Sequence, residues 1–199
     1  MKKVLLLITI LILITGCSLK DLFVRENDTI EYLTGKITVE INVLNYGLIK
    51  LELDADEAPI TVTNFVNLVE EKFYDGLTFH RIIGNFMIQG GDPKHDGTGG
   101  SGKTIKGEFN SNGIENNISH KRGVISMARG PYDNNSASSQ FFIVHQDSTF
   151  LDGDYAAFGH VTEGIEIVDQ IVNNVNPTEE DIEIPYENQP IIESIRIIE

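Results

Sequence analysis

The sequence has one cysteine, no tryptophan and few basic residues. Among its 199 residues are 15 Lys and Arg against 30 Asp and Glu, a formal net charge of −15. Such a chain repels phosphate backbones, and no basic stripe interrupts it, so no nucleic-acid binding is expected. A single cysteine excludes an internal disulfide. The domain must therefore be held by burial of its apolar residues, which make up 41% of the chain.

A long apolar run is also missing. Lys2 and Lys3 are followed by an apolar stretch at 4–14, interrupted only by Thr9. As a helix it would be roughly 16 Å long, whereas a bilayer core is roughly 30 Å thick. A permanent transmembrane helix is therefore not expected. The charged start, the short apolar run and the small residues after it predict a signal peptide at 1–16.

The position of Cys17 gives the only cysteine a role. Ile-Thr-Gly-Cys at 14–17 resembles the lipobox of bacterial lipoproteins, which implies lipidation of Cys17 and cleavage before it. We therefore expect a lipid-anchored protein at the outer face of the cytoplasmic membrane, with residues 17–35 as the tether. An ordinary secreted protein with a stray cysteine is the alternative. Whether Leu22 and Phe23 dock onto the following domain stays open.

From residue 36 onward, periodic patterns predict a folded domain that extends to residue 199. Apolar and polar residues alternate at 37–43 and 49–53, on either side of an Asn-Tyr-Gly turn, which predicts a β-hairpin. Apolar residues recur every three or four positions at 58–71, and again after Gly164, which predicts two amphipathic helices. Short strands are expected around 79–82, 86–89, 124–127, 140–144, 157–161 and 191–198. This pattern indicates a mainly β barrel or sandwich.

Six short segments, in this order along the chain, resemble those of the cyclophilins. They are Phe-His-Arg-Ile-Ile at 79–83, Phe-Met-Ile-Gln-Gly-Gly-Asp at 86–92, Ser-Met-Ala at 126–128, Ser-Gln-Phe-Phe-Ile at 139–143, Leu-Asp-Gly at 151–153 and Phe-Gly at 158–159. The resemblance spans roughly residues 36–198. It implies a mainly β, cyclophilin-like eight-stranded antiparallel β-barrel capped by two α-helices. It also implies peptidyl-prolyl cis/trans isomerase activity without a cofactor.

The same resemblance implies roles for individual residues. Arg81, Gln89 and Phe86 would be the catalytic residues. An arginine suits this reaction because the prolyl nitrogen regains its lone pair when the amide twists, and a guanidinium that never deprotonates can donate to it. The expected substrate contacts are Met87, Ala128, Arg129, Gln140, Phe142, Phe150, Leu151 and Tyr155. No metal site is expected, because the five histidines lack a short ligand spacing.

Two of the expected site residues depart from the family pattern. Phe150 stands where the best-known members have a tryptophan, so the indole N–H donor is missing there. We predict weak cyclosporin binding with isomerase activity largely retained. Tyr155 stands where many members have a histidine, which affects the expected peptide preference more than the activity.

Residues 97–104 also satisfy the P-loop pattern G-x-x-x-x-G-K-[ST]. That motif needs a buried strand before it and a helix after it, and the flanking sequence predicts neither. The expected function is therefore a prolyl isomerase that acts on proline-containing unfolded or exported polypeptides. The alternative is a surface lipoprotein that binds proline-containing peptides or host proteins, with incidental catalysis.

Overall fold

The structure is a computed structural model that describes residues 31–175 and 184–198. The predicted signal peptide, Cys17 and most of the predicted tether lie outside these ranges. Within them, no helix combines the length and the apolar character needed to cross a membrane. The last residues of the predicted tether contact the domain. The N–H of Leu33 donates to Oγ1 of Thr63 (2.8 Å) and that of Gly35 to Oδ1 of Asp56 (2.7 Å).

The first two strands form the predicted hairpin. β1 (Lys36–Val43) and β2 (Gly47–Asp54) pair in antiparallel register from Lys36 opposite Asp54 to Val43 opposite Gly47. Every second residue is buried from Val39 in β1 and from Ile49 in β2, and Val39, Ile41, Leu51 and Leu53 are fully inaccessible. The alternation in the sequence therefore does mark one core-facing side of the hairpin.

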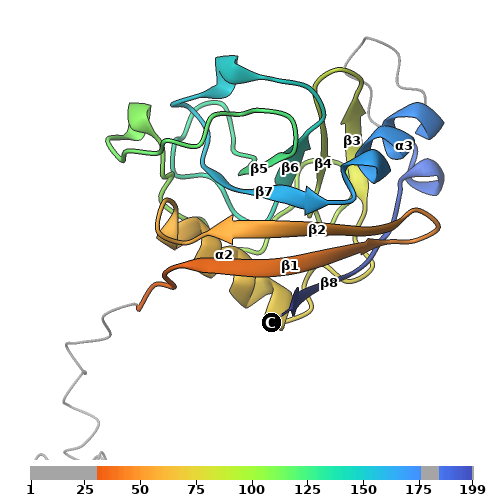
Figure 1. Ribbon diagram of the computed structural model, residues 1–199, viewed down its shortest axis with the longest axis horizontal. Helices are drawn as coiled ribbons and strands as arrows, with labels where there is room; N and C mark the ends of the chain where they lie inside the picture. Colours follow the sequence, from red (N-terminus) through yellow and green to blue (C-terminus); the bar gives the residue numbers. More distant parts are fainter. Residues whose placement is uncertain (1–30, 176–183, 199) are drawn as a thin grey trace, which may run out of the picture. The chain divides into compact units, whose positions relative to one another are not determined.

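Six further strands complete the sheet at the positions expected from the sequence. They are β3 (Phe79–Ile83), β4 (Met87–Gly90), β5 (Val124–Met127), β6 (Phe141–Val144), β7 (Ala157–Glu163) and β8 (Ile192–Ile198). The strand order is β3-β4-β6-β5-β7-β2-β1-β8, with antiparallel neighbours throughout. The mainly β fold with eight antiparallel strands is confirmed (Figure 1).

The eight strands form a half-barrel, so the expected eight-stranded β-barrel is confirmed only in part. The two edge strands, β3 and β8, do not pair along their lengths. Among the described residues, one isolated bridge between Thr78 and Ile191, just outside these strands, joins the two edges. The Pro190 carbonyl accepts the N–H of Phe79 beside it (2.9 Å). Because Pro190 has no N–H to donate, it suits a place where strand pairing stops.

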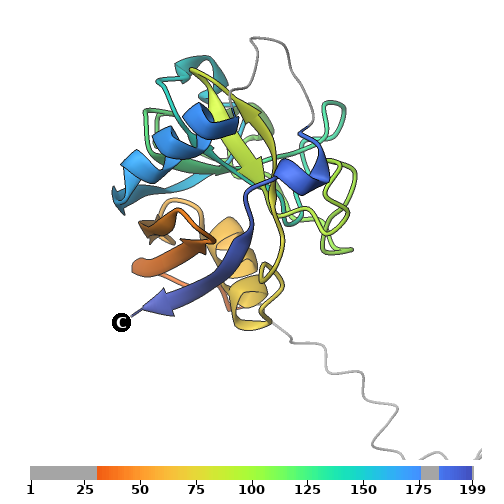
Figure 2. The same cartoon turned by 90° about the vertical axis from the view of Figure 1, so that its right-hand side faces the viewer.

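Two helices pack against this sheet, as predicted. α2 (Pro59–Glu70) contacts β2 and β8, and α3 (Ile165–Val175) contacts β2 and β3 (Figure 2). Pro59 occupies the first turn of α2, where its missing N–H costs nothing. The residue before it, Ala58, has no capping side chain. Instead the buried carboxylate of Glu108 accepts the N–H groups of Ile60 (2.9 Å) and Thr61 (2.7 Å).

The two faces of the sheet bury different side chains. In β6, Phe141 and Ile143 join the main core under the half-barrel, whereas Phe142 and Val144 point to the other side. We call the second group the pocket cluster. It consists of Met87, Val124, Phe142, Val144, Leu151 and Ala157. Because β-strand side chains alternate between the two faces, one face of the sheet packs into the continuous core and the opposite face carries the separate pocket cluster.

Candidate active site

Arg81 is positioned by an irregularity in β3. The pairing of β3 with β4 shifts register between Phe79 and Arg81, so that Phe79 and Ile82, three residues apart, both reach the main core. Arg81 and Ile83 then lie on the pocket side, where Ile83 packs against the pocket cluster. A bulge that re-aims one side chain is a common feature beside active sites.

A row of polar side chains leads away from Arg81. Its Nη1 donates to Oε1 of Gln89, directly opposite on β4, at 3.2 Å. Nε2 of Gln89 donates to Oε1 of Gln140 at 2.8 Å. Nε2 of Gln140 in turn donates to the carbonyl oxygens of Gly97 (2.9 Å) and Gly99 (2.8 Å). Because those carbonyls can only accept, the orientation of both amide side chains is determined, and Gln89 presents its oxygen to the guanidinium.

Ten of the eleven residues predicted for the site line one pocket of about 310 Å³. They are Arg81, Phe86, Met87, Gln89, Ala128, Arg129, Phe142, Phe150, Leu151 and Tyr155. The eleventh, Gln140, lines an adjoining cavity of about 370 Å³ that shares Gln89, Ala128 and Arg129 with the first. Met87 (1% exposed), Phe142 (4%) and Leu151 (7%) form the pocket's apolar floor. The structure thus combines a buried apolar floor with two guanidinium groups, those of Arg81 and Arg129, and the amide of Gln89.

Aromatic rings form the rim of this pocket. The rings of Phe86 and Phe150 lie 5.5 Å apart, and Phe150 is 73% exposed. Also at the pocket, the guanidinium carbon of Arg129 lies 4.7 Å from the ring centre of Tyr155 and 5.3 Å from that of Phe109. Its Nε also donates to the carbonyl of Asp154 (2.9 Å). These contacts restrain Arg129, so its positive charge is available at the rim without a carboxylate partner among the described residues.

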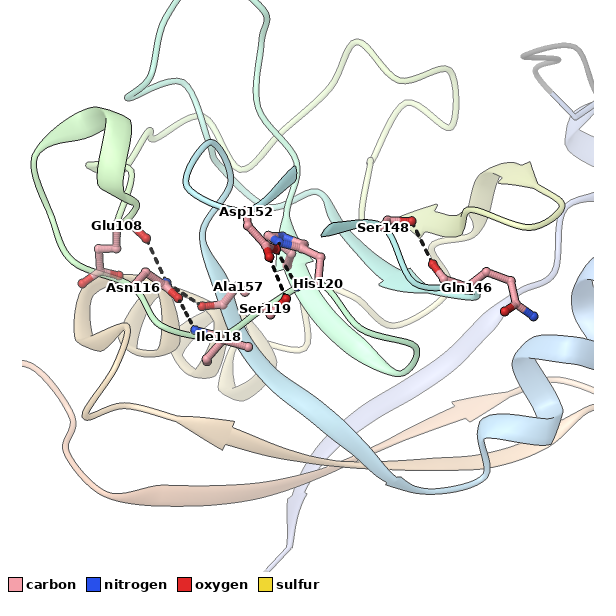
Figure 3. A network of polar contacts seen from close by, with 10 residues as sticks. Glu108, Asn116, Ile118, Ser119, His120, Gln146, Ser148, Asp152 and Ala157 are labelled. Carbon is pink, nitrogen blue, oxygen red and sulfur yellow. Dashed lines mark hydrogen bonds and ion pairs between the residues drawn. The ribbon is translucent and has the colours of Figure 1, made fainter. Parts of the chain in front are cut away.

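A polar network around the buried His120 connects Ser119, His120 and Asp152 (Figure 3). Asp152 accepts hydrogen bonds from the N–H of His120 (2.7 Å) and the hydroxyl of Ser119 (2.6 Å), and Nδ1 of His120 lies 2.8 Å from its Oδ1. The ring of His120 stacks on that of Phe142 at 6.0 Å. Burial lowers the pKa of His120. A neutral His120 therefore supports the pocket floor and anchors the turn at Thr149–Leu151.

These residues make a surface that can hold a proline ring and place a cation beside it. Comparison with known proteins identifies the family. Residues 37–197 match the model of the cyclophilin type peptidyl-prolyl cis-trans isomerase family. The chain is a cyclophilin. It is a peptidyl-prolyl cis/trans isomerase, as the sequence motifs predicted.

Its curated relatives carry the same activity in their names. Peptidyl-prolyl cis-trans isomerase B of Bacillus subtilis is 46% identical over 125 residues, covering 63% of this chain and 83% of the relative. Peptidyl-prolyl cis-trans isomerase A of Dickeya dadantii is 40% identical over 169 residues, covering 76% and 80%. A solved Cryptosporidium parvum cyclophilin superposes with a TM-score of 0.71 at 31% identity, covering 83% of this chain and 99% of its own.

Sequence reasoning missed the support behind the cyclophilin pocket. Asn116, for example, donates from Nδ2 to the carbonyls of Glu108 (2.9 Å) and Ala157 (2.8 Å), which are 8 and 41 residues away. Its Oδ1 accepts the N–H of Ile118 (3.1 Å). Asp152 lies within a recognised motif, but its partner His120 is 32 residues earlier. Only the fold brings such pairs together, so spacing gave no signal for them.

The P-loop-like segment has a different role from phosphate binding. No helix follows it directly, since the next helical turn of the described chain begins at Asn110. Its carbonyls at Gly97 and Gly99 face Gln140, and a Cβ at Gly99 would lie 1.9 Å from Oδ1 of Asp92. The glycine is therefore needed for close approach to Asp92. This loop orients Gln140 rather than forming an anion cradle.

Proposed function

We propose that this cyclophilin is a lipid-anchored isomerase of exported polypeptides, with Arg81 as its catalytic residue. The observation that carries the catalytic assignment is the side chain of Arg81 lining an apolar pocket, with one Nη held by Gln89. Phe86 and Gln89, the other predicted catalytic residues, line the same pocket.

The chemistry requires a rotation and no bond breaking between heavy atoms. Twisting an X–Pro amide costs about 18–20 kcal/mol because amide resonance is lost. In the twisted form the prolyl nitrogen is pyramidal and accepts a hydrogen bond, which it does not do in either planar isomer. A guanidinium aimed at that nitrogen stabilises the twisted amide preferentially, which is the requirement for catalysis.

The remaining pocket residues would hold the substrate. Met87, Phe142 and Leu151 bury the pyrrolidine ring, and Phe86 and Phe150 enclose it at the rim. The adjoining cavity at Gln140 and Arg129 would take the chain next to the proline. The similar Cryptosporidium parvum cyclophilin was also crystallised in the presence of the dipeptide Ala-Pro, which supports a proline-containing ligand for this pocket.

The amino-terminal sequence supports a place outside the cytoplasm. A charged start, a short apolar run and a lipobox-like Cys17 favour export followed by lipidation. Anchored at the membrane, the domain would meet polypeptides as they emerge unfolded, when their prolyl bonds still isomerise slowly.

Cell fractionation tests whether the protein is lipid-anchored, and a refolding assay tests whether it acts as an isomerase on exported polypeptides. We expect the full chain in the membrane fraction, extractable only with detergent, and Cys17→Ser in the soluble extracytoplasmic fraction. Both should accelerate the proline-limited refolding of an exported protein. A wild-type chain that fractionates as soluble would refute the anchor. Peptide binding without accelerated refolding would support the alternative, a binding lipoprotein with incidental catalysis.

A further inference from the structure

The turn between β3 and β4 carries Phe86 into the pocket rim, and its conformation is unusual. Asn85, before Phe86, has φ of 59°, in the left-handed region that few residues other than glycine adopt readily. The turn closes with a 3.2 Å hydrogen bond from the N–H of Phe86 to the carbonyl of Ile83. Phe86 itself packs against the pocket cluster and the ring of Phe150. Anything that fixes this turn therefore also fixes one wall of the pocket.

His145, which follows β6, makes two contacts with this turn. Its Nδ1 accepts the backbone N–H of Asn85 at 3.1 Å. The backbone N–H of His145 donates to the carbonyl of Phe86 at 2.8 Å. The side chain is 11% exposed, so water competes little for these positions. The imidazole thus joins the strand after the pocket floor to the turn that carries the pocket wall.

The geometry determines which nitrogen carries the proton. A backbone N–H can only donate, so Nδ1 must be unprotonated to accept from Asn85. The ring proton of the neutral imidazole then lies on Nε2, which is 3.1 Å from Oδ1 of Asp169 on α3. A second proton could only enter at Nδ1, where it would face the N–H of Asn85. Protonation and the hydrogen bond to the turn are mutually exclusive.

The charged groups around the ring come from two other elements. Asp169 on α3 favours the protonated form, whereas Arg122, in the segment before β5, opposes it. Arg122 also donates from Nη1 to the carbonyl of His145 (2.7 Å) and from Nη2 to Asp169 (2.8 Å). Because Asp169 is paired with Arg122, its carboxylate attracts a proton on His145 less strongly. Asp147, two residues further along, bonds the N–H of Arg122 and the ammonium of Lys121 instead of the ring. Burial is the largest influence and lowers the pKa of His145.

We propose that His145 is a positioning residue whose imidazole, while neutral, fixes the turn that carries Phe86 into the proline pocket. Substrate affinity then depends on pH through a group that never touches the substrate. α3 takes part through Asp169, which orients the ring from outside the pocket. The predicted loss of substrate affinity depends on the proposed function, since it assumes that this pocket binds the substrate of the isomerase. The hydrogen bond between His145 and Asn85 does not depend on that function.

The test compares three full-chain proteins across pH, using a proline-containing peptide as substrate. For the wild type we expect KM to rise roughly threefold to tenfold as the imidazole gains its proton, with kcat changed less. Because burial lowers the pKa of His145, this rise should come at a pH below the ordinary range of histidine. His145→Asn places an amide oxygen close to the position of Nδ1, so KM should stay near the neutral wild-type value at every pH. His145→Ala should show the raised KM throughout. His160→Gln, which removes an exposed histidine on β7, is the matched control and should follow the wild type.

Nuclear magnetic resonance gives a readout independent of activity. The amide resonance of Asn85 should move with the same midpoint as the imidazole resonances of His145. That movement should be absent in His145→Asn. The proposal would be overturned if the Asn85 amide resonance did not change as His145 titrates. It would also be overturned if KM changed with pH in His145→Asn as it does in the wild type. If the enzyme were inactive on the peptide but the Asn85 amide titrated as described, the isomerase assignment would fail and the link between the two residues would stand.

Discussion

Arg81 and Gln89 face each other across the paired strands β3 and β4, and Nη1 of Arg81 donates to Oε1 of Gln89 at 3.2 Å. Gln89 can present that oxygen because Gln140 accepts from its amide nitrogen. Arg81 is therefore oriented by a row of amides that ends in the backbone of the glycine-rich loop. Orientation of this kind reduces the reorganisation needed when the substrate amide twists.

Removing Gln140 should impair the isomerase without removing any group that acts on the prolyl nitrogen. In Gln140→Leu, Gln89 loses its acceptor and can turn its NH₂ group toward Arg81, which disfavours the productive orientation. We expect kcat/KM for a proline-containing peptide to fall about fivefold to tenfold. Gln146→Leu, a change at an exposed position, is the matched control and should leave the rate unaltered. Equal rates for both variants would contradict the row of amides as the orienting element.

Cyclosporin binding should be weak and should improve with an indole at the rim. Phe150 is 73% exposed beside Phe86 and offers no donor. In Phe150→Trp we expect affinity to increase about fivefold, as measured by calorimetry, because one hydrogen bond at a rim is worth about 1 kcal/mol. Tyr186→Trp, at an exposed residue that lines a different cavity, should change nothing. Nanomolar binding by the wild type would refute the prediction.

Glu108 should matter for stability and not for catalysis. Its buried carboxylate accepts the N–H of Ile60 and both the N–H and the hydroxyl of Thr61 at the start of α2. Glu108→Ala leaves these donors unsatisfied, so the free energy of unfolding should fall by about 2–3 kcal/mol, measured by denaturant titration. Glu115→Ala removes an exposed acid from the same loop and should change it by less than about 0.5 kcal/mol. A similar loss in both variants would contradict the capping role of Glu108.

The sequence predicted the elements well because each has a strong period or a matching motif. The hairpin from Lys36 to Asp54 shows a strict alternation, and α2 begins at Pro59 within the predicted helix. The expected barrel is only a half-barrel. Whether two edge strands pair depends on sheet curvature and on local backbone chemistry such as the missing N–H of Pro190, which periodicity does not describe.

The pocket was predictable for a different reason. Arg81 and the ten other site residues came from resemblance to a family, and the structure places all of them in two adjoining cavities. Residues such as His145 and Asn116 were not predictable. Their partners are backbone groups and side chains brought close only by the fold, as with His145 and Asn85, which are 60 residues apart. Their types, histidine and asparagine, carry no distinct signal at any fixed spacing.

The central claim is that Arg81 stabilises the twisted amide and contributes little to peptide affinity. The most direct test measures the isomerisation of a proline-containing peptide by the full chain and by Arg81→Ala, together with peptide affinity by calorimetry. We predict a fall in kcat/KM of about 10²–10³-fold, the usual cost of losing one donor to a transition state, with affinity nearly unchanged. Arg81→Lys should recover part of the rate, because it keeps the charge but not the planar set of donors. Equal rates for the wild type and Arg81→Ala would contradict the account.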